Sequence, residues 1–378
     1  MKVEELVTAR GVIICCGSGG VGKTTTAAVL ALEGARRGRR ACVVTIDPAK
    51  RLADTLGVEE LTNQAREIDP GLWGADTPDE ARGSLFALML DTKSTFDLLV
   101  TRNAGTPEQA ARILENRFYR NISGALGGTQ EYMAMEKLHE LYEEGGYDLI
   151  VVDTPPTRHA LDFLDAPQRL TRLLDNRIFR LLMMPTRATM RVASIAVQTF
   201  LRTVSRVVGS EVVNDIIAFF RAFEGMEEGF RERARAVDEL LADPDTAFVL
   251  VTSPRRDALD EATFFADRLA VNGQHVEALI VNRVHPSFGA EAPDGLRATA
   301  AALEERALPC SDHLAALYAN LADFRDVALL ERHHIDRLRD RIGGSVTVTY
   351  VPYLARDVYD FEALHEVGRI LVDTVSDS

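Results

Sequence analysis

The chain has 378 residues with 43 basic and 57 acidic side chains, a formal net charge of −14, and a hydrophobic content of 46%. The acidic balance argues against an extended nucleic-acid-binding surface, which needs clustered Lys and Arg, so we expect no nucleic-acid partner. The sequence has no run of about 18 apolar residues and no apolar segment before Gly11, so we expect neither a transmembrane helix nor a signal peptide.

The first predicted elements are a strand and a helix on either side of a glycine-rich loop. Residues 11–16 are apolar and β-branched, and residues 25–37 are rich in Ala and Leu. Between them, residues 17–24 read Gly-Ser-Gly-Gly-Val-Gly-Lys-Thr and fit the phosphate-binding loop pattern G-x-x-x-x-G-K-[ST]. The alternative is a chance glycine-rich turn before a helix, which the Lys-Thr pair and the upstream strand disfavour.

This loop predicts binding of a nucleotide's phosphates together with Mg²⁺. Its glycines let backbone N–H groups turn toward phosphate oxygens at the start of a helix. We expect Lys23 to reach the β- and γ-phosphates and the Thr24 hydroxyl to ligate Mg²⁺. The nucleotide-binding residues expected in the loop are Gly17, Ser18, Gly19, Gly20, Val21, Gly22, Lys23, Thr24 and Thr25.

A second apolar strand is predicted over residues 41–46, and it ends at Asp47 and Pro48. An Asp at the carboxyl end of a strand beside a phosphate loop lies where open α/β sheets bind ligands. Asp47 is therefore a candidate catalytic carboxylate that orients the attacking water at the γ-phosphate. The alternative is a helix N-cap with Pro48 at the first helical position, and both roles can hold together.

The middle of the chain mixes connections, strands and helices. Residues 61–81 are predicted to form a polar connection, and residues 84–90 a short strand. Residues 92–126 show a mixed helical pattern, and a further helix is expected from residue 127 to about residue 144.

A third clear strand is predicted over residues 148–152, and it ends in Asp153. An apolar run that ends in Asp is a weak signal alone. Joined to the loop at residues 17–24, it predicts that Asp153 is the carboxylate on the Mg²⁺ side of the site.

The remaining elements decide the predicted fold class. Further strands are predicted at residues 246–252, 276–281 and 345–351, with helices such as residues 257–271 between them. The alternation predicts an α/β P-loop NTPase with a mostly parallel sheet covered by helices on both faces. We expect one ATPase domain over residues 1–378, with helical insertions at residues 92–127 and 165–235.

Residues 169–206 differ from the rest of the chain in composition. They hold eight Arg, no Lys and one acidic residue, Asp175, with an apolar run that includes Met183 and Met184. One interpretation is an ordinary helical layer whose apolar side lies in the core. The other is an adaptable groove for an apolar partner helix, because Met is flexible and Leu-rich faces accept such helices.

Four stretches of the chain resemble the arsenite-pump ATPases and their relatives that target tail-anchored membrane proteins. Residues 153–159 read D-T-P-P-T-R-H and match that family's second switch, usually D-T-A-P-T-G-H, and residues 45–49 match its first switch. Residues 17–26 and 281–283 complete the resemblance.

The resemblance implies a cytoplasmic, Mg²⁺-dependent ATPase whose dimer closes around two nucleotides. It assigns Asp47 to water activation and Asp153 to the Mg²⁺ side, and it implies a client groove in the helical insertions. It also implies that Asn282 reads the adenine edge and that the Pro352 loop packs on the base. A strand-ending turn residue is the alternative for Asn282.

The sequence departs from that family at several positions. Ser18 stands where the family usually has a Lys that contacts the nucleotide of the other subunit, and Lys50 stands where it has a His. The paired C-x-x-C motifs of the eukaryotic zinc-linked dimers are absent. Cys15 and Cys16 are neighbours on a strand and face opposite ways. We therefore expect either a homodimer that uses Lys50 or Arg51, or a heterodimer with a Lys-bearing paralog.

Three functions are consistent with these features. The first is an ATP-hydrolysing targeting factor or chaperone for hydrophobic helices, which contacts the membrane transiently through a membrane-protein receptor. The second is an ATPase subunit of a membrane transporter. The third is a nucleotide-dependent scaffold with little turnover.

Overall fold

The computed structural model describes most of the chain as one α/β unit. The described residues are 2–46, 51–74, 82–122, 129–155, 160–175, 210–306, 309–343 and 346–373. Within them, a single sheet has the strand order β3-β4-β2-β5-β1-β6-β7-β8. Its strands are β1 (Val12–Cys16), β2 (Arg40–Thr45), β3 (Arg66–Glu67), β4 (Ser84–Met89), β5 (Leu149–Asp153), β6 (Thr246–Thr252), β7 (Val276–Val284) and β8 (Thr347–Pro352).

The sheet is parallel except for β3, which pairs antiparallel with β4. The predicted mostly parallel sheet is therefore confirmed. The prediction for residues 61–81 was wrong in part, because β3 and the short helix α4 (Pro70–Trp73) interrupt the polar connection. Trp73 is almost fully buried and donates its indole N–H to the Ile68 carbonyl, so this short stretch packs onto the domain.

Helices cover both faces of the sheet, as predicted. Side chains alternate along β1: Ile13 and Cys15 pack on one face, and Val12, Ile14 and Cys16 pack on the other. The first face is covered by α1 (Val3–Ala9), α2 (Lys23–Arg36), α3 (Arg51–Thr55), α4 and α18 (Phe361–Asp373).

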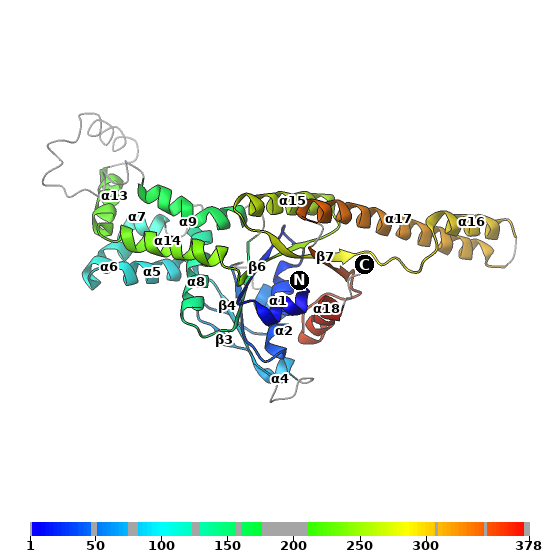
Figure 1. The fold of residues 1–378 in the computed structure, drawn as a ribbon, viewed down its shortest axis with the longest axis horizontal. Helices are drawn as coiled ribbons and strands as arrows, with labels where there is room; N and C mark the ends of the chain where they lie inside the picture. Colours follow the sequence, from blue (N-terminus) through cyan, green and yellow to red (C-terminus); the bar gives the residue numbers. More distant parts are fainter. Residues whose placement is uncertain are drawn as a thin grey trace.

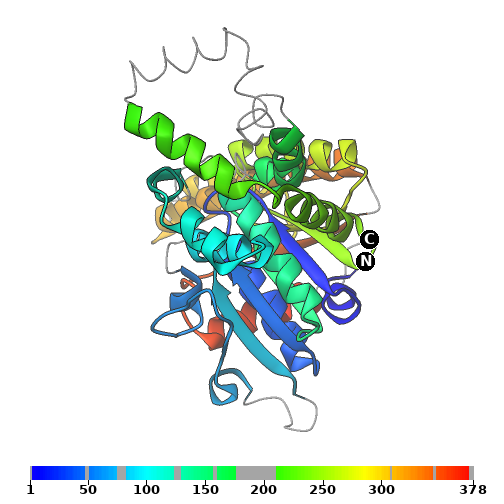
Figure 2. The same cartoon turned by 90° about the vertical axis from the view of Figure 1, so that its left-hand side faces the viewer.

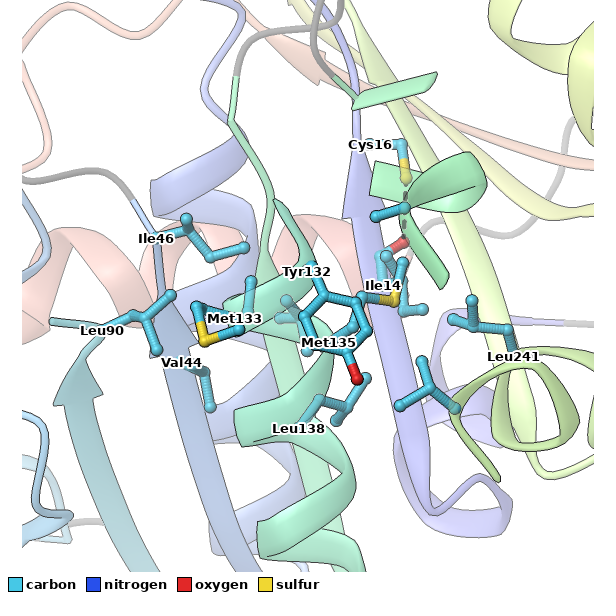
Figure 3. Packing of buried hydrophobic residues seen from close by; sticks show 14 of the residues in the cluster. Ile14, Cys16, Val44, Ile46, Leu90, Tyr132, Met133, Met135, Leu138 and Leu241 are labelled. Atoms are coloured by element: carbon cyan, nitrogen blue, oxygen red, sulfur yellow. Dashed lines mark hydrogen bonds between the residues drawn. The ribbon is translucent and has the colours of Figure 1, made fainter. Parts of the chain in front are cut away.

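The second face is covered by a larger set of helices. These are α5 (Thr92–Asn103), α6 (Pro107–Leu114), α7 (Arg117–Ile122), α8 (Thr129–Glu143), α9 (Ala160–Asp175), α13 (Ser210–Phe223), α14 (Glu227–Ala242), α15 (Arg256–Val271) and α17 (Ser311–Ile342). Met133, Met135 and Leu138 of α8 fill the space above the strands (Figure 3). Burial of this apolar surface is the main favourable contribution to folding here.

The helices of the second face extend past the sheet at one end. Figure 1 shows α5, α6, α7 and α13 gathered there, and Figure 2 looks onto this end of the molecule. Phe219 and Phe223 of α13 are buried, and Phe219 stacks on Tyr119 of α7 with 6.1 Å between ring centroids. The described apolar face of α13 therefore belongs partly to the core.

A helical hairpin extends from the opposite end (Figure 1). It consists of α16 (Pro293–Glu304) packed against the first half of α17, while the second half of α17 returns to the sheet. This hairpin was not predicted from the sequence. No helix among the described residues combines the length and apolar character that crossing a membrane requires.

Candidate nucleotide-binding site

The glycine-rich loop joins the end of β1 to the start of α2, and its conformation requires glycine at two positions. Gly17 has φ of 157°, and a Cβ there would lie 2.0 Å from the Val251 carbonyl oxygen. Gly22 has φ of 98°, and a Cβ there would lie 2.2 Å from the Asn282 Nδ2 atom. Any side chain at either position would clash and would strain the backbone.

Two hydroxyl groups, one at the start of α2 and one at the end of β2, donate to the same carboxylate. Thr24 Oγ1 donates a hydrogen bond to Asp153 Oδ2 (2.7 Å), and Thr45 Oγ1 donates to the same oxygen (3.0 Å). Lys23 is buried and donates from Nζ to the Ser18 carbonyl oxygen (2.8 Å). The sequence-predicted Lys23, Thr24 and Asp153 are thus brought together at the carboxyl edge of the sheet.

A cavity of about 460 Å³ opens beside these groups. Gly19, Gly20, Gly22, Lys23, Thr24, Thr25, Asp153, Asn282 and Pro352 all line it, and so does Arg51. Ser18 and Val21 line a neighbouring hollow instead. Asp47 and Lys50 lie outside the described residues, so the structure does not locate them.

Asn282 ties the end of β7 to the loop. Its Nδ2 donates to the Val21 carbonyl (2.8 Å), and its Oδ1 accepts from the Arg283 N–H (2.9 Å). These bonds match the turn role expected of a strand-ending Asn. The amide retains one N–H and a lone pair at the cavity wall, so a role toward the base stays a prediction.

Among the cavity residues that were not predicted from the sequence, Arg283 and Tyr353 lie beside the loop and the Pro352 turn. Arg283 has φ of 61°, and its guanidinium donates to the Gly20 carbonyl (3.1 Å), which fixes the outer side of the loop. Tyr353 is exposed and follows Pro352 at the end of β8. The sequence signal that could have identified them is their position, because Arg283 directly follows Asn282 and Tyr353 directly follows Pro352.

Three of the four cysteines are buried, and no cysteine is among the described residues that line the cavity. Cys15, Cys16 and Cys42 are buried in β1 and β2, as expected. Burial raises the pKa of Cys16 and Cys42 to about 12, and burial together with the Asp153 charge raises the pKa of Cys15. These thiols stay protonated, whereas metal binding requires the thiolate.

The residues present fit Mg²⁺, which prefers hard oxygen ligands. A hydroxyl and a carboxylate meet at the cavity wall, and a Cβ built on Gly20 of the loop would meet no atom within 4 Å.

Comparison with known proteins supports the same interpretation. The family described as anion-transporting ATPase matches residues 10–306, which include the loop, Asp153 and Asn282. The chain belongs to this family. As a member of the anion-transporting ATPase family, it has the α/β P-loop fold that the sequence predicted.

Several relatives of this anion-transporting ATPase family member are recognisable. An Aquifex aeolicus protein whose name places it among the arsenical pump-driving ATPases is 28% identical over 284 residues, or 73% of this chain and 63% of the relative. An uncharacterized Streptomyces coelicolor protein is 31% identical over 278 residues, or 72% of this chain and 62% of the relative. The chain thus spans less than two thirds of both. The ATPase get3 of Aspergillus terreus is 30% identical over 159 residues, or 42% of this chain and 43% of the relative.

The loop assignment predicts a loss of nucleotide affinity in Lys23→Ala. The substitution removes a charge-assisted contact to phosphate, which costs about 1.5–3 kcal/mol. We expect the affinity for ATP, measured by calorimetry, to fall roughly tenfold or more. Unchanged affinity in a folded variant would contradict the assignment of the loop.

Proposed function

We propose that this chain binds ATP with Mg²⁺ and hydrolyses it. The observation that carries the proposal is the 2.7 Å hydrogen bond between Thr24 and Asp153 on the wall of the cavity. A hydroxyl at the start of a helix and a carboxylate at the end of a neighbouring strand are the pair that P-loop enzymes use to hold the metal. The relatives named as ATPases support the same activity.

Each part of the site has a separate task in this proposal. The loop N–H groups and Lys23 would hold the triphosphate, and Thr24 and Asp153 would hold Mg²⁺. When bound, Mg²⁺ supplies positive charge that offsets the charge developing on the phosphate oxygens. Asp47 would orient the attacking water. In support, Ile46, the last described residue before Asp47, donates its N–H to the Asp153 carbonyl (3.3 Å).

The proposed chemistry predicts that Asp47→Asn retains ATP binding but loses turnover. The amide keeps the size and capping capacity of the side chain but cannot accept a proton from water. We expect single-turnover hydrolysis to slow by roughly 10²–10⁴-fold. Asp54→Asn is the matched control, because Asp54 also lines the cavity and has no catalytic task in the proposal. Equal rates in the parent and Asp47→Asn would reduce Asp47 to a helix cap.

We further infer that the nucleotide state is coupled to the helices beyond the sheet. Thr154 follows Asp153 and is held by the Cys15 carbonyl (2.8 Å), and the chain then leads toward α9. Helix α9 packs against α8 and α14, and its Asp165 accepts from Arg268 of α15 (2.9 Å). A change at the phosphate end of β5 therefore has a packed route to the helical layer, as ATP-driven dimer closure would require.

The client proposed for this layer is a hydrophobic helix. Because Phe219 and Phe223 of α13 are buried in the core, the residues available for a client fall mainly in residues 176–209, which the structure does not describe. That segment contains most of the eight Arg of residues 169–206, together with Met183 and Met184. Flexible Met side chains suit an apolar helix, and the Arg frame suits anionic head groups near a membrane.

Replacement of Met183 and Met184 by Asp tests this client site. We expect capture of a detergent-solubilised transmembrane segment to be lost while ATP affinity is unchanged, because two charges would be desolvated in the groove. Leu72→Asp is the control, since Leu72 is an exposed apolar residue of α4 on the other face. Failure of the double variant to fold would assign the Met pair to the core.

A transporter-associated role is the alternative function. The family description, anion-transporting ATPase, favours it, and the two roles share the ATPase chemistry. Co-purification with an integral membrane transporter, rather than with free hydrophobic segments, would decide for this alternative. In either role we infer a cytoplasmic protein that meets the membrane transiently through a receptor.

The proposed assembly is a dimer, and Ser18 bears on its composition. Two triphosphates facing each other across a closed interface repel, and a neutral Ser hydroxyl is too short to bridge subunits. We propose that the partner is a related chain with Lys at this position. A homodimer that uses Lys50 or Arg51 is the alternative.

Expression of the chain alone and then with its paralogs tests the partner. We expect the chain alone to hydrolyse ATP slowly and the Lys-bearing paralog to raise both dimer mass and ATPase rate, measured by sedimentation and phosphate release. A stable homodimer with full activity that no paralog changes would contradict the heterodimer.

A further inference from the structure

Strand β7 ends in a β-bulge whose extra residue is Arg283. Asn282 pairs with Val351 of β8 and Val284 pairs with Pro352, so Arg283 falls between two consecutive pairs of the register. Its φ is 61°, in the left-handed region that residues with a side chain rarely adopt. A bulge of this kind changes the direction in which a side chain leaves the strand.

The bulge brings two consecutive side chains to the same loop. In a regular strand, neighbouring side chains point to opposite faces of the sheet. Here Asn282 Nδ2 donates to the Val21 carbonyl (2.8 Å), and the guanidinium of Arg283 donates to the Gly20 carbonyl (3.1 Å). The strained backbone of Arg283 therefore accompanies a pair of contacts that regular alternation would not allow, and strain of this kind is typical of functional sites.

The residues after the bulge are anchored outside the loop. The Val284 carbonyl accepts the Tyr353 N–H (2.9 Å). The next residue, His285, donates its N–H to Glu331 of α17 (3.0 Å), and His285 Nδ1 lies 2.7 Å from the second carboxylate oxygen of Glu331. The start of the β8–α18 connection and helix α17 therefore hold the bulge in place, so that Arg283 has a fixed support.

A bond to the Gly20 carbonyl also sets the direction of the next N–H group. The peptide units of the loop are trans, and in a trans unit the C=O and the N–H point in opposite directions. Because the Gly20 carbonyl is turned toward Arg283, the Val21 N–H points away from that side chain. In the same way, Asn282 holds the Val21 carbonyl and turns the Gly22 N–H away. The end of β7 thus sets the direction of two successive N–H groups of the loop.

The direction of these N–H groups matters for a phosphate ligand. Gly20 and Gly22 line the nucleotide cavity together with Asn282 and Arg283. In loops of this type, backbone N–H groups bind the α- and β-phosphates of a nucleotide. Donors that already point in the required direction bind an anion without the free-energy cost of reorienting them.

We propose that Arg283 is a positioning residue for nucleotide binding, which holds the Gly20 peptide unit so that the Val21 N–H faces the phosphates. The inference rests on the proposed function, because it assigns a further residue to the same site. A direct contact of the guanidinium with the γ-phosphate is the competing role. The two roles differ for ADP, which has the α- and β-phosphates but no γ-phosphate.

Calorimetry with ATP and with ADP tests the positioning role. Arg283→Ala removes the guanidinium, and we expect the affinities for ATP and ADP to fall by the same factor, roughly three- to tenfold. The single-turnover rate at saturating ATP should stay within about twofold of the parent, because a contact of equal strength in the ground state and the transition state changes binding alone. Arg341→Ala is the matched control, since Arg341 is exposed, pairs with Asp267 of α15 and is not among the residues that line the cavity.

The outcomes of this experiment separate the inference from the proposed function. Unchanged affinity for both nucleotides in Arg283→Ala, or a loss confined to ATP, would overturn the positioning role. Failure of the parent chain to bind either nucleotide would refute the proposed function. Arg283→Gly is the second variant, because Gly adopts this backbone conformation without strain. It should lose affinity to the same extent, with a melting temperature no lower than that of Arg283→Ala.

Nuclear magnetic resonance of the nucleotide-free chain tests the orientation of the peptide unit itself. Isotope labels on the glycine carbonyl carbon and the valine nitrogen select Gly–Val peptide units, of which the sequence has three, at residues 11–12, 20–21 and 57–58. In Arg283→Ala we expect the signal of residues 20–21 to move, because its carbonyl loses a hydrogen bond, while the other two signals stay in place as internal controls. An unmoved signal of residues 20–21 would overturn the proposal even where the affinity falls, since the guanidinium would then act on the nucleotide directly.

Discussion

The hydrogen bond between Thr24 and Asp153 depends on the parallel pairing of β1 with β5. That pairing sets Cys15 opposite Asp153, so the chain leaves β1 level with the end of β5 and the first turn of α2 faces the carboxylate. Strand β2 pairs on the other side of β5 and sets Thr45 opposite the same residue. Asp153 is 1% exposed, and the two hydroxyl donors offset the cost of burying its charge.

The nucleotide cavity and the hollow beside Ser18 share four lining residues, Gly19, Gly20, Arg283 and Tyr353. Arg283 contributes its backbone to the turn after Asn282 and its guanidinium to the Gly20 carbonyl, and Tyr353 stacks on His285 with 6.0 Å between ring centroids. Since His285 is anchored on Glu331, a shift of the loop around a nucleotide would move groups that reach α17. This geometry gives the nucleotide cavity and helix α17 a physical basis for coupling.

Two helical extensions leave the sheet in opposite directions (Figure 1), and both are tied to strand ends near the loop. One begins at α9 after β5, and partly buried ion pairs link its helices: Glu136 of α8 bonds to Arg233 of α14, and Arg102 of α5 bonds to Glu140 of α8 (2.9 Å). The other is the hairpin after β7.

The sequence by itself determined the local chemistry and most of the elements. Residue types at short spacing indicate the glycine-rich loop, the two strands that end in Asp and the alternation of strands and helices. Residues 17–24 and Asp153 could therefore be singled out from the sequence as candidate site residues. Only the tertiary structure decided the strand order, the sharing of Asp153 by Thr24 and Thr45, and the hollow beside Ser18. The hairpin of α16 and α17 was also not predicted, because the residue pattern of α17 does not show whether its apolar side chains are buried or exposed. Whether a side chain is buried depends on which strands and helices from distant parts of the sequence pack against it. The spacing of residues along the chain does not contain that information.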